Sequence, residues 1–155
     1  MVNLYEKLSS SAITLQLKGK DQEEIVEGLV ELLVRAGAPI DREEAVREVL
    51  HRERLGGTGL EAGVALPHAK LSSVREVLVA FGRSKKGVDF GALDGVPARL
   101  FFLVLGPKES PEEYLQTIAR ISRLTSKEGL RKTLLDSQSP EEVIEAIRQY
   151  EEARG

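Results

Sequence analysis

The sequence predicts an α/β fold, a single domain in which a mixed β-sheet is flanked by α-helices. Segments with the apolar spacing of helices alternate with the short apolar runs of strands. Such interleaving is typical of a sheet covered by helices. The chain has 155 residues, enough for one self-sufficient core, and contains no low-complexity stretch or linker. We therefore expect residues 1–155 to form one domain.

A strand and two helices are predicted for the first third of the chain. Ile13–Leu17 alternates apolar and polar residues, as a half-buried strand does. Asp21 stands where a helix N-cap would, and Gly37 marks the end of that helix. Asp41, with Glu44 three residues on, has the pattern of a capping box at the start of the second helix. The apolar residues at helical spacing are Ile25, Leu29, Leu32 and Leu33 in the first helix, and Val46, Val49 and Leu50 in the second.

A glycine-rich loop and three strands are predicted for the middle of the chain. The loop is indicated by Gly56, Gly57, Gly59 and Gly63, which exclude a helix and favour positive φ or a close approach of the backbone to something else. Val64–Leu66 and Val77–Phe81 have the composition of short buried strands. A turn at Asp94 and Gly95 precedes the strongly β-prone run Leu100–Leu105, which we expect to be a central strand.

Two helices with similar start signals are predicted for the last third. Ser110 is expected to cap the first, with Pro111 at its first position and Glu113 at its third. The expected apolar face of this helix consists of Leu115, Ile118, Ile121 and Leu124. The same start signal recurs at Ser139, Pro140 and Glu142.

Composition excludes several classes of function. With 22 Lys and Arg against 25 Asp and Glu, the net charge is −3, and no strong cationic face for nucleic-acid binding is expected. The absence of cysteine excludes disulfides and thiolate chemistry. The N-terminus lacks a secretory signal, and the longest apolar run, Leu100–Leu105, is too short to span a bilayer. We expect a cytoplasmic protein without direct membrane insertion.

The candidate for chemistry is His68, which follows the glycine-rich loop. Imidazole can act as a general base, a metal ligand or a nucleophile at neutral pH. A metal site is poorly supported, because His51 is the only other imidazole and does not stand at a ligand spacing. A serine hydrolase would need a G-x-S-x-G motif, which is missing. Two alternatives remain on local sequence: a nucleophile for a phosphoryl group bound by the loop amides, or an ordinary surface histidine after a long turn.

The stretch "TGLEAGVALPHAK", Thr58 to Lys70, resembles the phosphorylation-site motif of the fructose/mannitol-type enzyme IIA domains. These are the type-2 enzyme IIA components of the bacterial phosphoenolpyruvate-dependent phosphotransferase system, and the nitrogen-regulatory enzyme IIA proteins belong to the same family. The family's Arg-Glu pair is matched by Arg52 and Glu53. Its DG-x-P turn before a hydrophobic strand is matched by Asp94, Gly95 and Pro97.

The resemblance implies that His68 accepts a phosphoryl group through Nε2 from the phosphocarrier HPr. Arg52 is then the candidate for the positive charge beside the phosphoryl group. Thr58 is expected either to donate its hydroxyl to a phosphoryl oxygen or to bond locally within the loop. Glu53 is expected to orient Arg52 or to be a surface carboxylate. Lys70 is read as a solvated lysine and His51 as a structural or surface residue.

Two positions depart from the family pattern. Many members have a second histidine early in the helix after the hydrophobic strand, where this chain has Tyr114. Tyr114 is expected either to donate a hydrogen bond to the imidazole or the phosphoryl group, or to be a core aromatic residue. Glu61 replaces a frequent glycine and is expected to place a like charge near the phosphate.

The resemblance leads to two hypotheses of function. The first is a phosphocarrier, a component of a phosphotransferase, that passes the phosphoryl group from His68 to an enzyme IIB or signals with it. The second is a regulatory interaction module of the same fold, which switches between target proteins with its phosphorylation state and transfers nothing onward. Neither hypothesis calls for a cofactor or a metal.

Overall fold

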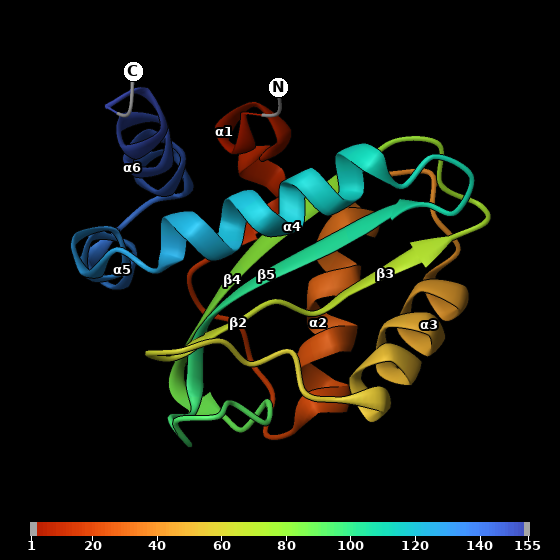
Figure 1. The fold of residues 1–155 in the computed structure, drawn as a ribbon, viewed down its shortest axis with the longest axis horizontal. Coiled ribbons are helices and arrows are strands. Elements are labelled where there is room, and N and C mark those ends of the chain that lie inside the picture. Colours follow the sequence, from red (N-terminus) through yellow and green to blue (C-terminus); the bar gives the residue numbers. More distant parts are fainter. Residues whose placement is uncertain (1–2, 154–155) are drawn as a thin grey trace.

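The computed structural model describes residues 3–153, and within them a five-stranded mixed sheet lies between two layers of helices (Figure 1). The strands are β1 (Ile13–Thr14), β2 (Val64–Ala65), β3 (His68–Leu71), β4 (Leu78–Val88) and β5 (Ala98–Pro107). The helices are α1 (Leu4–Lys7), α2 (Gln22–Arg35), α3 (Arg42–Leu55), α4 (Glu112–Thr125), α5 (Glu128–Asp136) and α6 (Pro140–Glu152), with a 3-10 turn η1 at Ser10–Ala12. The predicted fold class, a mixed sheet flanked by helices, is confirmed.

Strand β5 is the centre of the sheet. It pairs antiparallel with β4, and its other edge pairs in parallel first with β2 and then with β3. Strand β1 adds to the far side of β4 in parallel. His68 stands opposite Val104 in the β3–β5 register. The prediction of a central strand at Leu100–Leu105 is therefore confirmed, and His68 lies on an edge strand beside it.

Each face of the sheet has its own apolar core. Helices α2 and α3 cover one face, and α1, α4, α5 and α6 cover the other; in Figure 1, α4 crosses in front of the sheet and α2 lies behind it. Successive side chains of β5 alternate between the two cores. Because both faces are covered, β5 reads as a continuous apolar run rather than an alternating one. The residues facing α2 and α3 are Phe101, Leu103 and Leu105, and those facing the other layer are Leu100, Phe102 and Val104.

The predicted starts of three helices are confirmed by their capping hydrogen bonds. The side chain of Asp21 accepts from the backbone N–H of Glu24 at 2.9 Å, and Asp41 accepts from Glu44 at 3.1 Å. Ser139 accepts from Glu142 at 3.2 Å, and a proline opens α6 as predicted. Among the described residues, no helix is both long enough and apolar enough to cross a membrane.

The start of α4 differs from the prediction. Ser110 does not cap it; Pro111 occupies the N-cap position, no side chain caps the helix, and the Pro111 carbonyl accepts from the N–H of Leu115 at 2.9 Å. The helix thus begins one residue later than expected. Tyr114 takes the buried position in the first turn, so Leu115 points outward and is 57% exposed, whereas Ile121 is buried as predicted.

Several other elements differ from the prediction: strand β3 was not predicted, and β4 continues beyond Phe81 to Val88. Only Ile13–Thr14 pair as β1; the chain bends at Leu15 and Gln16, where the N–H of Gln16 donates to the Thr14 hydroxyl, and the N–H of Leu17 donates again to Arg83 of β4 at 2.8 Å. Helices α1 and α5 were not predicted. Neither has a side-chain N-cap bond, so the sequence offers no start signal for them.

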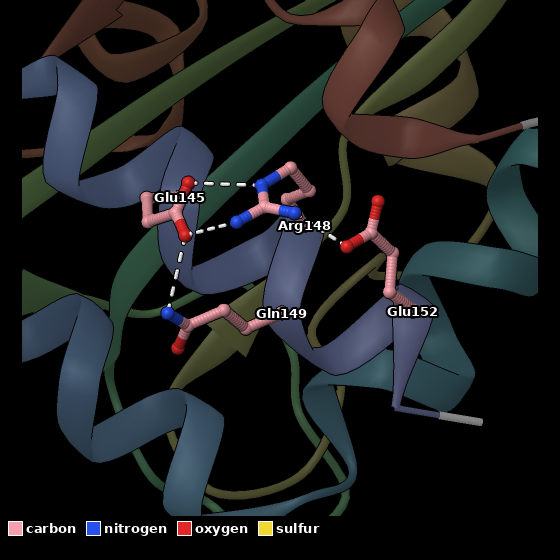
Figure 2. A network of polar contacts seen from close by, with 4 residues as sticks. All are labelled: Glu145, Arg148, Gln149 and Glu152. Atoms are coloured by element: carbon pink, nitrogen blue, oxygen red, sulfur yellow. Dashed lines mark hydrogen bonds and ion pairs between the residues drawn. The ribbon is translucent and has the colours of Figure 1, made fainter. Parts of the chain in front are cut away.

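Helix α6, near the C-terminus, contacts helix α1, near the N-terminus, through Glu151. The buried carboxylate of Glu151 accepts from the backbone N–H groups of Leu4 (2.8 Å) and Tyr5 (2.9 Å) and lies 3.5 Å from Arg120. On the outer face of α6, Arg148 bridges Glu145 and Glu152, and Glu145 also accepts from Gln149 at 3.1 Å (Figure 2). Glu151 therefore supplies the cap that α1 lacks in its own sequence, while the exposed network contributes little to stability.

The glycine-rich loop packs closely against the segment 90–92. A Cβ added to Gly57 would lie 2.5 Å from the Phe90 carbonyl oxygen, and one added to Gly59 would lie 2.8 Å from the same oxygen. The N–H of Gly59 donates to that oxygen at 2.9 Å. Further along, Ala62 has φ +60° and donates its N–H to the carboxylate of Asp94 at 2.9 Å. The predicted close approach is thus an approach to another part of the chain.

This packing predicts a large difference between two glycine substitutions. Gly59→Ala should lower the free energy of unfolding by roughly 1–3 kcal/mol, because the added methyl group overlaps backbone atoms that cannot move independently. Gly56→Ala is the matched control, since a Cβ there meets nothing within 4 Å and the backbone is extended, and it should cost under about 0.5 kcal/mol. Urea denaturation measures both, and equal costs would contradict the packing argument.

Candidate functional site

His68 opens strand β3 and points away from the core beneath α2 and α3. Its neighbours Ala69 and Leu71 face that core, so the alternation along the strand turns His68 toward the α4 side of the sheet. The imidazole is half-buried. Its ring centroid lies 6.0 Å from that of Tyr114 in α4, with the planes at 59°. His68 is therefore held between an edge strand and a helix, with part of its ring open to solvent.

One nitrogen of His68 is committed to the backbone. Nδ1 lies 2.6 Å from the carbonyl oxygen of Leu66. A carbonyl can only accept, so Nδ1 carries the proton and Nε2 keeps its lone pair. Burial lowers the pKa of His68, the bond to Leu66 works against this, and the charge of Arg52 lowers the pKa further. The ring is accordingly neutral at pH 7, with a nucleophilic Nε2.

A hydrogen-bonded path fixes the position of that backbone carbonyl. The carboxylate of Glu53 accepts from the N–H of Thr58 at 2.8 Å and from its hydroxyl at 2.6 Å. The carbonyl of Thr58 accepts from the N–H of Leu66 at 3.0 Å, and Leu66 in turn holds His68. Burial raises the pKa of Glu53, and its bonds to Thr58 and the charge of Arg52 lower it. The end of α3 is therefore connected to the imidazole through the loop.

This path decides between the alternatives for two residues. Thr58 is 6% exposed and its hydroxyl donates to Glu53, so it bonds locally, and the hydroxyl is not directed at a ligand of His68. Glu53 is also 6% exposed and neither orients Arg52 through an ion pair nor lies on the surface, so both expectations for it were wrong. The spacing of apolar residues in α3 did not indicate that this carboxylate is buried.

His68 lines a surface hollow of about 490 Å³, which we call the His68 hollow. One wall is a face of α3 made of Glu48, His51, Arg52 and Leu55. The opposite wall is the first half of α4, with Tyr114, Leu115 and Ile118, and β3 and Lys108 complete the lining. Leu55 at the rim is 72% exposed. The hollow thus combines a neutral imidazole, several cations and exposed leucines.

Arg52 supplies a fixed positive charge to the hollow. Its Nη1 donates to the carbonyl oxygen of Gly56 at 2.8 Å, which holds the side chain at the end of α3. Within residues 3–153, no carboxylate oxygen lies within 4.0 Å of the guanidinium. Its charge lowers the pKa of both His68 and Tyr114. Arg52 is thus a cation without a carboxylate partner near the imidazole.

Tyr114 is a core aromatic residue, one of the two alternatives that the sequence left open, and the donor role stays a prediction. The side chain is 4% exposed and packs in the core under α4. It can do so because Gly106 in β5 has no side chain; a Cβ there would lie 2.5 Å from the tyrosine ring. No described residue bonds the hydroxyl, and that oxygen is not among the fully buried polar atoms, so it reaches the hollow. Burial raises the pKa of Tyr114 to about 12, against the lowering effect of Arg52, and keeps the hydroxyl protonated.

The glycine-rich loop does not form the phosphate cradle that was expected. The N–H groups of Gly59, Leu60 and Ala62 are bonded to other parts of the chain, and no glycine of the loop lines the His68 hollow. Glu61 lines a separate hollow near Leu93, so the expectation of a like charge beside His68 was wrong. The glycines instead let the loop pack closely on the segment 90–92.

His51 and Lys70 are both exposed and both lie in the lining of the His68 hollow. His51 is a surface residue, one of the two readings that the sequence left open, but its place beside His68 was not expected. Within the described part of the chain, no cluster of three or more histidine, cysteine or acidic side chains could hold a metal ion. The chemistry available in the hollow is therefore that of a nucleophilic imidazole beside cations and a hydroxyl donor.

Comparisons with known proteins agree with this description. Residues 6–150 match the family model "Phosphoenolpyruvate-dependent sugar phosphotransferase system, EIIA 2". The chain is 36% identical over 150 residues to the fructose-specific EIIABC component of Bacillus subtilis, covering 97% of this chain and 24% of that protein. It is 36% identical over 140 residues to the fructose-specific EIIA component of Haloferax volcanii, covering 90% and 91% of the two chains.

Solved structures show the same fold. The nitrogen regulatory protein IIA-Ntr of Neisseria meningitidis superposes with a TM-score of 0.86 at 30% identity, over 93% of this chain and 98% of that one. Enzyme IIA mannitol of Escherichia coli, in its complex with phosphorylated enzyme IIB mannitol, gives 0.77 at 27% identity, over 92% and 98%. The chain therefore belongs to the type-2 EIIA family and is a phosphocarrier component of the phosphotransferase system.

The bond between Glu53 and Thr58 predicts a pH-dependent cost for Thr58→Val. At pH 7 the variant should be less stable by roughly 1–3 kcal/mol, because a buried carboxylate loses a hydroxyl donor. Losing that donor raises the pKa of Glu53 further above its ordinary 4.5, so the variant binds a proton more readily than the wild type when folded. The cost should therefore shrink as the pH falls from 7 toward 4.5.

Thr133→Val is the matched control for this measurement. Its hydroxyl is exposed and bonds only the Gly129 carbonyl, so its cost should be small at every pH. Guanidinium denaturation at a series of pH values measures both variants. A cost of Thr58→Val that stays constant with pH would show that Glu53 does not respond to the threonine hydroxyl.

Proposed function

We propose that His68 is the phosphoacceptor and that it takes its phosphoryl group through Nε2 from an HPr-type phosphocarrier protein. The observation that carries this proposal is the bond from Nδ1 to the Leu66 carbonyl, which leaves Nε2 unprotonated. The low pKa of His68 keeps the ring neutral at cytoplasmic pH. The resemblance of residues 58–70 to the family's phosphorylation motif supports the same assignment.

The transfer step follows from this geometry. The Nε2 lone pair forms the new bond to phosphorus while the bond from phosphorus to the donor breaks, and that electron pair leaves with the donor. Positive charge develops on the imidazole as Nε2 reacts. The Nδ1–H bond to the Leu66 carbonyl stabilises that charge without moving the proton. Glu53 and Thr58 are positioning residues, since they act through Leu66.

Arg52 is the main electrostatic partner in this proposal. A phosphoryl group brings nearly two negative charges into the His68 hollow. Two unit charges about 4 Å apart at an effective dielectric near 20 attract by roughly 4 kcal/mol, which exceeds a typical net hydrogen bond. Lys70 and Lys108 line the same hollow and add weaker attraction. The Tyr114 hydroxyl, protonated at any physiological pH, donates a hydrogen bond to a phosphoryl oxygen.

The rim of the hollow supports docking of partner proteins. Leu55 and Leu115 are 72% and 57% exposed on opposite walls, around a nucleophile that is itself only half-buried. A donor or acceptor protein covers these leucines when it brings its own reactive group to His68. An enzyme IIB is the proposed acceptor, because a similar enzyme IIA is known in complex with phosphorylated enzyme IIB. The cytoplasmic location stays a prediction.

A second candidate function is a switch that binds regulatory target proteins according to its phosphorylation state. Its support is the likeness to the nitrogen regulatory protein of Neisseria meningitidis. The fructose-specific relatives support onward transfer to a sugar pathway instead. The chain spans 24% of the length of the Bacillus subtilis relative, so sugar transport by a whole protein of that kind is likewise a proposal.

The acceptor residue is tested by labelling. Incubation with phosphoenolpyruvate, enzyme I and HPr should add one acid-labile phosphate, and His68→Gln should abolish it while the circular dichroism spectrum stays unchanged. His51→Gln is the matched control, since it removes the other histidine and should still be labelled. Label that survives in His68→Gln would place the acceptor elsewhere.

The electrostatic partner is tested by transfer rates. Arg52→Ala should slow phosphoryl transfer from HPr by about one to three orders of magnitude, the effect of losing a few kcal/mol in the transition state. Arg54→Ala, on the same helix but outside the lining of the hollow, should change the rate little. Tyr114→Phe, which removes only the hydroxyl, should slow transfer less than Arg52→Ala. Equal rates for the two arginine variants would remove Arg52 from the site.

Onward transfer distinguishes the carrier from the switch. The labelled protein is mixed with a panel of purified enzyme IIB proteins, and loss of label to one of them supports the carrier. Retention of label against the whole panel, together with a target protein that binds only one phosphorylation state, supports the switch.

A further inference from the structure

The face of α3 that lines the His68 hollow carries a second imidazole. Glu48, His51, Arg52 and Leu55 stand at spacings of three, four and seven residues, which places them on one face of a helix. The adjoining face, with Ala45 and Val49, is buried against the sheet. His51 is exposed. The hollow thus contains two histidines, His68 on its floor and His51 on its α3 wall.

The charges that surround His51 come from three of the elements around the hollow. On its own helix, Glu48 is negative and Arg52 positive. Strand β3 contributes Lys70, and the segment after β5 contributes Lys108. The α4 wall contributes the neutral residues Tyr114, Leu115 and Ile118, and His68 is itself neutral. Cations therefore outnumber anions in the hollow before a phosphoryl group arrives.

A phosphoryl group on His68 changes this balance. Its charge of nearly −2 offsets the excess positive charge, so a proton on His51 becomes more favourable than it is in the unphosphorylated protein. Imidazole is the side chain that changes charge near neutral pH, so a modest change in potential is enough to change its state. Among the described residues that line the hollow, His51 is the only exposed imidazole.

We propose that His51 takes up a proton from solvent when His68 is phosphorylated, and that its positive charge then stabilises the phosphorylated state from the α3 wall. This inference rests on the proposed phosphorylation of His68. By linkage, the coupling is reciprocal: phosphorylation favours the proton on His51, and the proton favours phosphorylation by the same factor. The equilibrium between this protein and its phosphoryl donor therefore depends on pH near neutrality through His51.

The direct test is the protonation state of His51, measured by imidazole 15N chemical shifts at pH 7 before and after phosphorylation by HPr. The ratio of protonated to neutral His51 should rise about two- to fourfold, because a charge near −2 is added to the same hollow in surroundings of high dielectric. A 31P signal from phosphohistidine establishes in the same sample that His68 is modified. An unchanged ratio in a phosphorylated sample overturns the role of His51 and leaves the proposed function intact.

A second measurement uses the transfer equilibrium. The phosphorylated fraction at equilibrium with HPr is measured between pH 6 and pH 8 for the wild type and His51→Gln. Contributions of the donor and of the phosphoryl group itself are common to both, so their difference isolates His51. The wild type should gain phosphorylated form about two- to fourfold more than the variant as the pH falls. Parallel pH profiles overturn the proposal.

Arg42→Gln is the matched control for the equilibrium measurement. It removes a positive charge from the first residue of the same helix, outside the His68 hollow, where Arg42 pairs with Glu31 at 2.7 Å. Its pH profile should match that of the wild type. A change in Arg42→Gln as large as in His51→Gln would show that any charge on α3 suffices, and would also overturn the specific role of His51.

Discussion

The hydrogen bond between His68 Nδ1 and the Leu66 carbonyl is the interaction on which the site depends. It selects the tautomer, leaves the lone pair on Nε2 and, in the proposed transfer, stabilises the positive charge that forms on the ring. The bond exists because β2 and β3 pair with the same edge of β5 one after the other, with Pro67 between them. The carbonyl of Pro67 accepts from Val104 at 3.1 Å, so the connection itself is part of the sheet. The nucleophile is therefore oriented by strand pairing as much as by side chains.

Burial has opposite effects on the pKa values of the two aromatic residues at the site, and both effects favour neutrality. It lowers the pKa of His68 and raises that of Tyr114 to about 12, because in each case the charged form is the one that loses solvation. Arg52 is the cation whose charge lowers the pKa of both residues. Since no carboxylate oxygen in the described part of the chain lies within 4.0 Å of its guanidinium, the hollow contains a positive charge without an ion-pair partner.

The sequence was most informative where a local signal has a single structural meaning. Capping residues placed three helix starts, and the apolar run at Leu100–Leu105 placed the central strand. The motif around His68 led to the family and to the residue that lies in the hollow. The sequence failed where a tertiary contact decides the outcome. Helix α1 is capped by Glu151, which lies far along the chain, so no local sequence pattern indicates that bond.

At the site, too, local motifs were informative and tertiary contacts were not foreseen. His68, Arg52 and Tyr114 line the same hollow, as the resemblance implied, and Thr58 bonds locally, one of its two alternatives; Glu53, expected to orient Arg52 or to lie on the surface, is instead the buried partner of Thr58. Their pairing depends on how the loop after α3 folds back, which the spacing of five residues does not determine. For the glycines, the sequence left open a cradle for a phosphoryl group or a long turn, and their lack of side chains serves the contact with Phe90 and Ala92. His51 was predicted to be a structural or surface residue because it lies in a helical stretch away from the glycine-rich loop. In the structure it lines the same hollow as His68.

The contact between Gly106 and Tyr114 has a consequence for how the site can diverge among related sequences. The tyrosine ring occupies the space that any side chain at position 106 would need, with 2.5 Å between the ring and a notional Cβ. The two positions are therefore not free to change independently: a larger residue at 106 requires the aromatic ring at 114 to be lost or moved away from His68. A substitution on the buried strand β5 is in this way tied to the identity of the residue that lines the His68 hollow from α4. In related sequences, the residues at positions 106 and 114 are therefore expected to change together.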